Sequence, residues 1–162
     1  IPFDLIVDVG ASEGELAFGG LRITGLNLNA GAADMKVRFE ELNPAELELM
    51  TVRSGAARLE FISLGNANLQ ELAFDGGVGT YEFDLRGDWQ RSAAVKIKSG
   101  VSHIVLRIPR DIGVRVCPGD LKSGNYDDLS RQGECYANDI YENSELKLDI
   151  DLDVGLSSVE VK

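Results

Sequence analysis

The sequence predicts an all-β, single-domain protein over residues 1–162, built as a parallel β-solenoid-like stack of glycine-cornered repeats. Three observations predict this fold. Glycine recurs at spacings of 21, 24, 22, 23 and 55 residues, apolar and polar residues alternate on both sides of it, and turn-forming residues separate the units. A period in the low twenties is typical of proteins in which each repeat stacks on its neighbours. The corner glycines are Gly10, Gly31, Gly55, Gly77, Gly100 and Gly155.

Each corner glycine is flanked by two expected strands. In the unit around Gly77, apolar side chains stand five and three residues before the glycine (Leu72, Phe74) and four and six residues after it (Tyr81, Phe83). Strict alternation is the pattern of a strand with one buried face. We therefore expect these positions of all units to form one continuous interior, although the first unit is weaker after its glycine. We expect Phe61, Phe83 and Leu106 to be nearly fully buried and in mutual contact.

The glycine marks a corner because the two apolar sets differ in parity. The residue directly after each glycine is Ala, Val or Leu and shares its parity with the apolar positions before the glycine. The apolar positions from four residues on have the opposite parity, so a straight strand would place the two sets on opposite faces. The chain must bend by one residue, and we expect the bend two or three residues after the glycine.

An antiparallel meander that folds at each glycine is the alternative architecture. Hairpin turns favour Asn-Gly or Asp-Gly pairs. The residues that precede the six glycines are Val9, Ala30, Ser54, Gly76, Ser99 and Val154. This is poor hairpin chemistry, so the sequence favours the solenoid.

Return loops should follow each unit. Segments 40–44, 64–68 and 87–91 are rich in Asn, Gly, Asp and Pro, which form turns for steric and hydrogen-bonding reasons. Residues 43–49 contain the pattern of a short helical turn. Trp89, in the third loop, is expected to plug one end of a rung, with a ligand platform as the alternative.

The repeat is interrupted by an irregular excursion over residues 109–144. It holds one expected strand, around Val114, and then a stretch rich in Gly, Asp and Asn. Cys117 and Cys135 bracket this stretch. A disulfide between them would stabilise the fold by about 3 kcal/mol in the chain-entropy description. Two unpaired thiols are the alternative.

The C-terminal strand is expected beside the fifth unit, with the excursion looping out without adding a full rung. Aligning the glycines then places Lys96 opposite Asp151 and Lys98 opposite Asp153. Opposite charges across a strand pair contribute about 0.2–1 kcal/mol each. Asp149, Asp151 and Asp153 share one face of this strand. They are interpreted as a solvated acidic face, with a Ca²⁺ site as the alternative.

Composition limits the classes of partner. Sixteen basic and 27 acidic residues give a net charge of −11, which disfavours nucleic acid and anionic membrane surfaces. No apolar run approaches the about 20 residues of a membrane-spanning helix. The chain begins with Ile1-Pro2 and shows no signal peptide. We expect an extracytoplasmic or cell-surface domain, anchored by a segment missing from this chain.

No residues form a recognisable catalytic, cofactor-binding or metal-binding motif. His103 is the only histidine and lies close to a corner, where it is interpreted as a surface side chain rather than a base or a ligand. The corner serines have no partner base. We therefore expect a protein that is not an enzyme, with no cofactor.

The sequence also resembles a known protein family. The order of glycine and apolar positions resembles the toast-rack domain of the cell wall-active antibiotics response family, the C-terminal module of LiaF-like envelope-stress proteins. The segments that carry the resemblance are residues 77–85, 100–109, 113–116, 136–141 and 155–161. The resemblance implies a β-solenoid-like domain at the bacterial cell envelope. In the better-known relatives this domain acts with a membrane-embedded part to restrain a sensor kinase.

The expected function is therefore that of a non-enzymatic interaction domain of a bacterial cell-envelope protein, in envelope-stress sensing or regulation. It would bind a protein partner, or associate with itself, through its sheet faces or open ends. A carbohydrate- or calcium-binding adhesin-like module is the alternative. A hydrolase built on a β-solenoid is a third class, and it would need acids and bases gathered in a groove.

Overall fold

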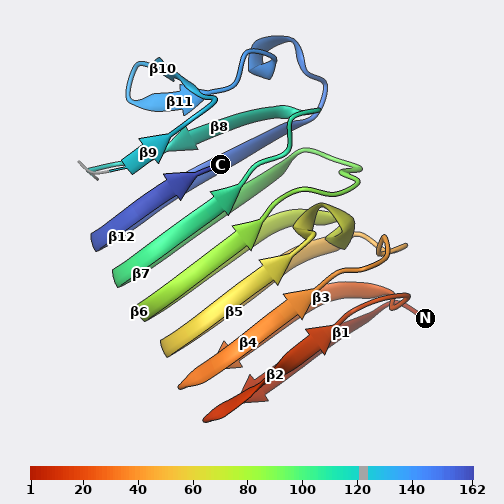
Figure 1. Ribbon diagram of the computed structural model, residues 1–162. Helices are drawn as coiled ribbons and strands as arrows, with labels where there is room; N and C mark the ends of the chain where they lie inside the picture. The colour runs from red at the N-terminus through yellow and green to blue at the C-terminus, as the bar shows by residue number, and fades with distance from the viewer. Residues whose placement is uncertain (121–123) are drawn as a thin grey trace.

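The computed structural model describes residues 1–120 and 124–162, which form a parallel β-solenoid (Figure 1). The first two units consist of two strands each, and the later units of one long strand that continues through the corner. The strands of the stack are β1 (Phe3–Val9), β2 (Ser12–Ala17), β3 (Ile23–Ala30), β4 (Ala33–Arg38), β5 (Leu47–Ile62), β6 (Leu69–Asp84), β7 (Ala93–Arg107) and β12 (Lys147–Val161).

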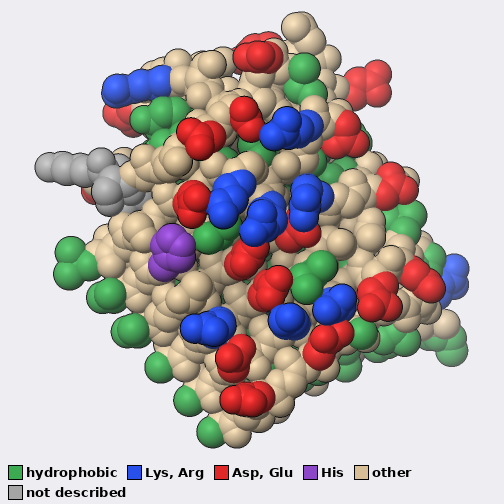
Figure 2. Space-filling view, in the orientation of Figure 1, with side chains coloured by type: hydrophobic (Ala, Val, Ile, Leu, Met, Phe, Trp, Pro, Cys, Tyr) green, Lys and Arg blue, Asp and Glu red, His purple; other side chains and the backbone are tan. Residues whose placement is uncertain are grey.

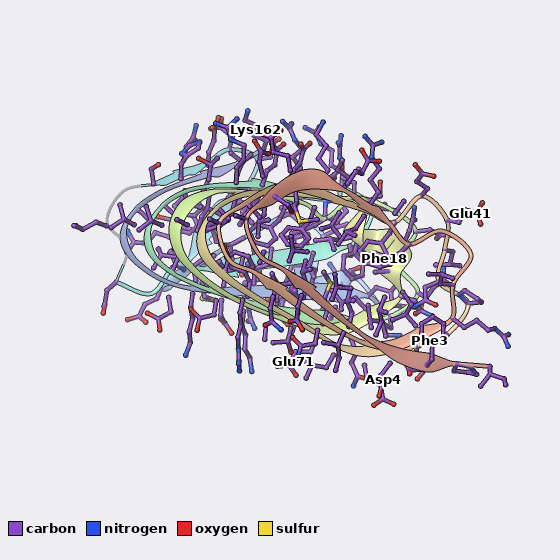
Figure 3. All side chains as sticks on the ribbon, turned by 90° about the horizontal axis from the view of Figure 1, so that it is seen from below. Phe3, Asp4, Phe18, Glu41, Glu71 and Lys162 are labelled. Atoms are coloured by element: carbon purple, nitrogen blue, oxygen red, sulfur yellow. A yellow bond between two sulfur atoms is a disulfide. The ribbon has the colours of Figure 1, made fainter. Side chains whose placement is uncertain are left out.

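Neighbouring units are parallel and in register, with equivalent positions beside each other. Leu28 pairs with Val52, Val52 with Phe74, and Phe74 with Ile97. The two arms of each unit form the two broad faces of a flattened cylinder (Figure 3). This arrangement confirms the parallel solenoid and excludes the meander, because an antiparallel fold would reverse every second strand.

The predicted interior is confirmed. Phe61, Phe83 and Leu106 are fully buried. The rings of Phe61 and Phe83 stack in parallel with centroids 5.1 Å apart, and Phe83 lies opposite Leu106 in the ladder. Phe74, from the other arm, meets the ring of Phe83 edge-on at 5.1 Å. Aromatic side chains from both arms thus close the space between the two faces.

The corner bends at a different place from the one predicted. The glycine and the residue after it both face outward, and the second residue after it already belongs to the buried set, as Ala57 does. The predicted bend two or three residues after the glycine is therefore wrong. The units approach each other closely at the glycine: a Cβ atom on Gly77 would lie 2.5 Å from the carbonyl oxygen of Gly55. The alternation of buried and exposed side chains therefore shifts by one residue at the corner glycine, where the neighbouring backbone leaves no room for a Cβ atom.

The return loops contain buried polar anchors in place of the predicted helical turn at residues 43–49. Asn43 is buried, and its amide group donates to the carbonyls of Ile23 (2.7 Å) and Ala67 (3.2 Å). Its Oδ1 accepts from the Ile23 N–H at 3.2 Å. One side chain thus joins three successive loops, and these bonds hold the segment in a non-helical path. The 3₁₀ turn of this side lies one loop later, at η1 (Leu64–Ala67).

Trp89 covers one end of its own rung, as predicted. It is buried among the core side chains, and its Nε1 donates to the carbonyl of Leu85 at 2.7 Å. A Cβ atom on Gly65 would lie 2.9 Å from that nitrogen. The indole therefore packs against the preceding return loop and closes the side of the stack.

The C-terminal strand has the predicted register. β12 pairs with β7, so that Asp151 lies opposite Lys96 and Asp153 opposite Lys98. The excursion is not a rung between β7 and β12. It forms a cap beyond β12, with β8 along the first arm and β9 along the second. The cap consists of β8 (Gly113–Cys117), β9 (Gly124–Tyr126), β10 (Ser130–Gln132), β11 (Cys135–Ala137) and the 3₁₀ turn η2 (Tyr141–Asn143).

Candidate interaction surfaces

The two ends of the stack differ. At the C-terminal end, β8 and β11 continue the sheet beyond β12, and the chain folds back at β10 (Figure 1). Cys117 of β8 and Cys135 of β11 are joined by a disulfide. The rings of Tyr126 and Tyr136 stack with centroids 4.1 Å apart. This end is closed by short, crosslinked strands.

The N-terminal end is open. β1 pairs only with β3 and β2 only with β4, so within residues 1–120 and 124–162 nothing pairs with their outer edges (Figure 3). The apolar side chains of this first unit are incompletely covered. Leu5 and Val7 are half-buried, whereas Leu26 and Leu28, their counterparts one unit on, are buried. One more strand would complete the burial of the first unit.

The open edge of β1 presents backbone hydrogen-bonding groups. The carbonyl of Val9 accepts from the N–H of Gly31 at 2.9 Å, so the backbone groups of Val9 point to β3. In a strand these groups alternate in direction from one residue to the next. The N–H and C=O groups of Asp4, Ile6 and Asp8 therefore point to the open side.

The same edge is acidic. The residues whose backbone groups face the open side carry the first carboxylates of the chain, Asp4, Asp8, Glu13 and Glu15, and residues 1–21 contain no Lys or Arg. Glu15 pairs with Arg38 of β4 at 2.7 Å. Among the described residues, the other three carboxylates have no Lys or Arg within ion-pair distance.

Gly10 lies at the open end of the glycine column. In the later units a Cβ on the corner glycine would meet the carbonyl oxygen of the preceding corner glycine, at 3.2 Å for Gly55 and 3.1 Å for Gly100. At Gly10 the corresponding space is empty: a Cβ atom there would meet nothing within 4 Å. The first unit thus has room for the backbone of a further turn.

Exposed apolar side chains form a ridge along the corners. The residue after each glycine faces solvent, with 57% of Val78, 49% of Val101 and 83% of Leu156 exposed. A single row of hydrophobic side chains follows this edge at the left of Figure 2. A shallow groove of 580 Å³ runs beside it, lined mostly by small residues such as Ala33 and Gly79. We call this row the corner ridge.

The broad face seen in Figure 2 carries charges of both signs. Some charged side chains pair across neighbouring units. Arg107 donates to Glu82 at 2.6 Å, and Lys96 lies 3.3 Å from Glu71. Opposite charges across a strand pair are mildly stabilising, whereas like charges oppose pairing. Several neighbouring units are therefore joined by opposite charges, although Glu13 lies opposite Asp34 and Glu60 opposite Glu82.

Two of the polar residues considered in the sequence, His103 and Asp149, contact neighbouring polar side chains. His103 is exposed, with its Nδ1 2.7 Å from the hydroxyl oxygen of Ser158. Asp149 accepts a hydrogen bond from the hydroxyl of Tyr141 at 2.7 Å, and its Oδ1 forms an ion pair with Nε of Arg115 at 3.0 Å. Burial, together with this hydrogen bond to Asp149, raises the pKa of Tyr141 to about 12. Within the described ranges, no three His, Cys, Asp or Glu side chains are placed to hold a metal ion.

Sequence reasoning identified the glycine column and named open ends as a binding surface, but it did not identify which end is open, and it missed the ridge. The open edge had one signal in the sequence, because residues 1–21 lack Lys and Arg while the later units pair opposite charges. The ridge was assigned to the interior by the parity argument. Its outward direction follows from the placement of the bend, which only the structure supplies.

The chain belongs to the toast_rack family. The family described as "N-terminal domain of toast_rack, DUF2154" matches residues 1–62 and again residues 42–107. The two matches overlap at residues 42–62, so the family pattern recurs along the repeated part of the chain.

A solved structure shares the fold. It is a protein from Clostridium sporogenes described as a "putative cell adhesion protein", with a TM-score of 0.59 and 15% identity, and the match covers 98% of this chain and 92% of that one. The comparison with curated proteins finds no match. Among the described residues, no helix has the length and apolar character needed to cross a membrane.

Proposed function

We propose that this chain is a non-enzymatic interaction domain of a bacterial cell-envelope protein and that it binds its partner through the open N-terminal end of the stack. One observation carries the proposal: the C-terminal end is closed by cap strands and a disulfide, whereas the N-terminal end leaves its strand edges and apolar side chains partly uncovered. Solenoid ends need a cap unless something covers them.

Three observations support the cellular setting and the absence of catalysis. The toast_rack family and the description of the structural neighbour both fit the cell surface. The disulfide between Cys117 and Cys135 fits an oxidising compartment outside the cytoplasm. The grooves are shallow and lie over flat sheets, which suits contact with another chain better than enclosure of a substrate.

Photo-crosslinking in the native cell tests this proposal. A benzophenone amino acid at position 6, on the open edge, should give a discrete adduct with one protein, because 68% of Ile6 is exposed beside the unpaired backbone groups. The same probe at Val78, on the corner ridge and far from the open end in the stack, is the matched control. An adduct from position 78 alone would move the interface to the ridge, and no adduct from either would overturn the proposal.

An adhesin-like module that binds carbohydrate or Ca²⁺ is the second candidate. The description of the structural neighbour as a cell adhesion protein favours it. Calorimetric titration of the chain with Ca²⁺ and with surface glycans tests it. A saturable heat with either ligand, together with no adduct from position 6, would replace the interaction domain by this alternative.

A further inference from the structure

We propose that the open end recognises an extended polypeptide segment that continues the stack, with aliphatic side chains facing the interior and Lys or Arg facing outward, and that it rejects a second copy of this chain. The inference rests on the proposed function and adds the chemistry of the partner. Among the described residues, two features of the first unit carry it: the open edge, with its unpaired backbone groups and the empty space at Gly10, and the acidic side chains that lack a Lys or Arg partner.

The backbone edge sets the conformation of the partner. The N–H and C=O groups of Asp4, Ile6 and Asp8 point away from β3, so an added strand would find hydrogen-bonding groups at every second residue. Strand addition to an exposed sheet edge is a recurrent mode of peptide recognition, in which the backbone gives affinity and alternate side chains give specificity. Leu5 and Val7 would pack against the aliphatic side chains of the added strand.

The empty space at Gly10 sets the depth of approach. Inside the stack a carbonyl oxygen of the preceding unit occupies this place, and a Cβ on Gly77 or Gly155 would meet it at 2.5 or 2.6 Å. At Gly10 the same place is empty, because no described residue fills it. The first unit can therefore receive a partner whose backbone follows the corner.

The acidic side chains set the charge of the partner. Among the described residues, the hydrogen-bond donors to the Asp4 and Asp8 carboxylates are the uncharged Thr24 and Asn29, whereas some carboxylates of later units, such as Glu71 and Glu82, form ion pairs with Lys or Arg. A cationic side chain on the added strand would extend the charge pairing that the stack already uses.

A second copy fits this edge poorly. Two β1 strands paired antiparallel about a two-fold axis at Ile6 would place Asp4 of one copy opposite Asp8 of the other, at two symmetric positions. Like charges directly opposite each other disfavour pairing. The other end of a second copy is covered by its own cap strands. Charged side chains on an edge strand are a common protection against self-association.

The test uses two labelled peptides and fluorescence anisotropy with the chain. The first copies residues 93–107, because this unit carries Lys96 and Lys98 outward, the second of which aligns with Asp8 when the glycines are superposed. The second peptide differs only in Lys96→Glu, Lys98→Glu and Arg107→Glu. We expect the cationic peptide to bind at least about tenfold more tightly at low salt. The difference should shrink in 1 M salt, where the Debye length is about 3 Å.

Variants of the chain locate the binding. Ile6→Pro removes an edge N–H that points outward, so it should abolish binding, whereas Ile6→Thr keeps this donor and should bind. Gly10→Ala places a methyl group in the space for the partner backbone and should weaken binding at least about tenfold without loss of stability. Gly19→Ala is its control, because a Cβ there also meets nothing within 4 Å. Asp8→Lys should reduce or reverse the preference between the two peptides.

The outcomes separate this inference from the proposed function. Equal binding of both peptides, sensitive to Ile6→Pro, would overturn the cationic partner and leave the open-end interface intact. No binding of either peptide would overturn the inference, while the adduct from position 6 still decides the proposed function. A dimer of the unmodified chain in sedimentation velocity, lost in Ile6→Pro, would identify a second copy as the occupant and overturn it as well.

Discussion

Phe83→Ala tests the interior register of the solenoid. Phe83 is fully buried, stacks on Phe61 and meets Phe74 edge-on, both with centroids 5.1 Å away. Truncating a buried Phe to Ala lowers the free energy of unfolding by about 3–5 kcal/mol through lost transfer energy and a cavity. Each aromatic pair adds about 0.5–1.5 kcal/mol beyond area burial. We therefore expect a loss in the upper half of that range, about 4–5 kcal/mol.

The assay is equilibrium unfolding in urea, followed by circular dichroism and Trp89 fluorescence with the disulfide intact. Two controls fix the interpretation. Phe83→Leu keeps most of the volume and should cost about 1.5 kcal/mol, and Leu49→Ala, at a half-exposed position, should cost about 0.5 kcal/mol. If Phe83→Ala costs no more than Leu49→Ala at an unchanged m-value, the assigned interior is refuted.

Three further predictions concern the loops and the cap. Asn43→Ala should lower the free energy of unfolding by about 3 kcal/mol in the same urea assay, because three buried backbone groups lose their partner at about 1 kcal/mol each; a loss below about 0.5 kcal/mol would contradict this. Thiol titration of unfolded, unreduced protein should find no reactive group at Cys117 or Cys135, and two reactive thiols would reject the disulfide. Tyr141→Phe should cost about 1 kcal/mol at pH 7 by removing the bond to Asp149. The folded pKa of Tyr141 lies near 12, above its ordinary value of 10, so this stabilisation is complete below pH 10 and falls as the pH rises towards 12; a cost that stays constant over this range in urea unfolding would contradict the assignment.

The stack could be predicted because two signals agree along the chain. The alternation of side chains identifies each strand, and the glycine identifies the point at which successive units must align. Aligning the glycines was sufficient to place Lys98 opposite Asp153, across a sequence separation of 55 residues. A register that is fixed by burial on one face at every unit leaves little freedom for slippage.

The return loops could not be predicted because local propensity and tertiary contacts compete there. Residues 43–49 carry a helical pattern, but the side chain of Asn43 bonds to backbone groups of two other loops. Those bonds exist only once the stack has formed. Trp89 was expected at one end of a rung, but its contacts show the same dependence, because its hydrogen bond to Leu85 is local and its packing against the loop at Gly65 is not.

The function was harder to predict than the fold because it depends on which repeats lack a neighbour. Every unit has similar edges, and a sequence of similar units does not state which edge is covered. The cap lies between the fifth and sixth units in the chain, yet in space it lies beyond the sixth, because β12 inserts between β7 and β8. The crossover places the cap at the C-terminal end, and the first unit, with Asp8 and the empty space at Gly10, is the other, exposed end of the described stack. The order of the strands in the sheet therefore shows which strand edge is open, and the sequence of similar units does not.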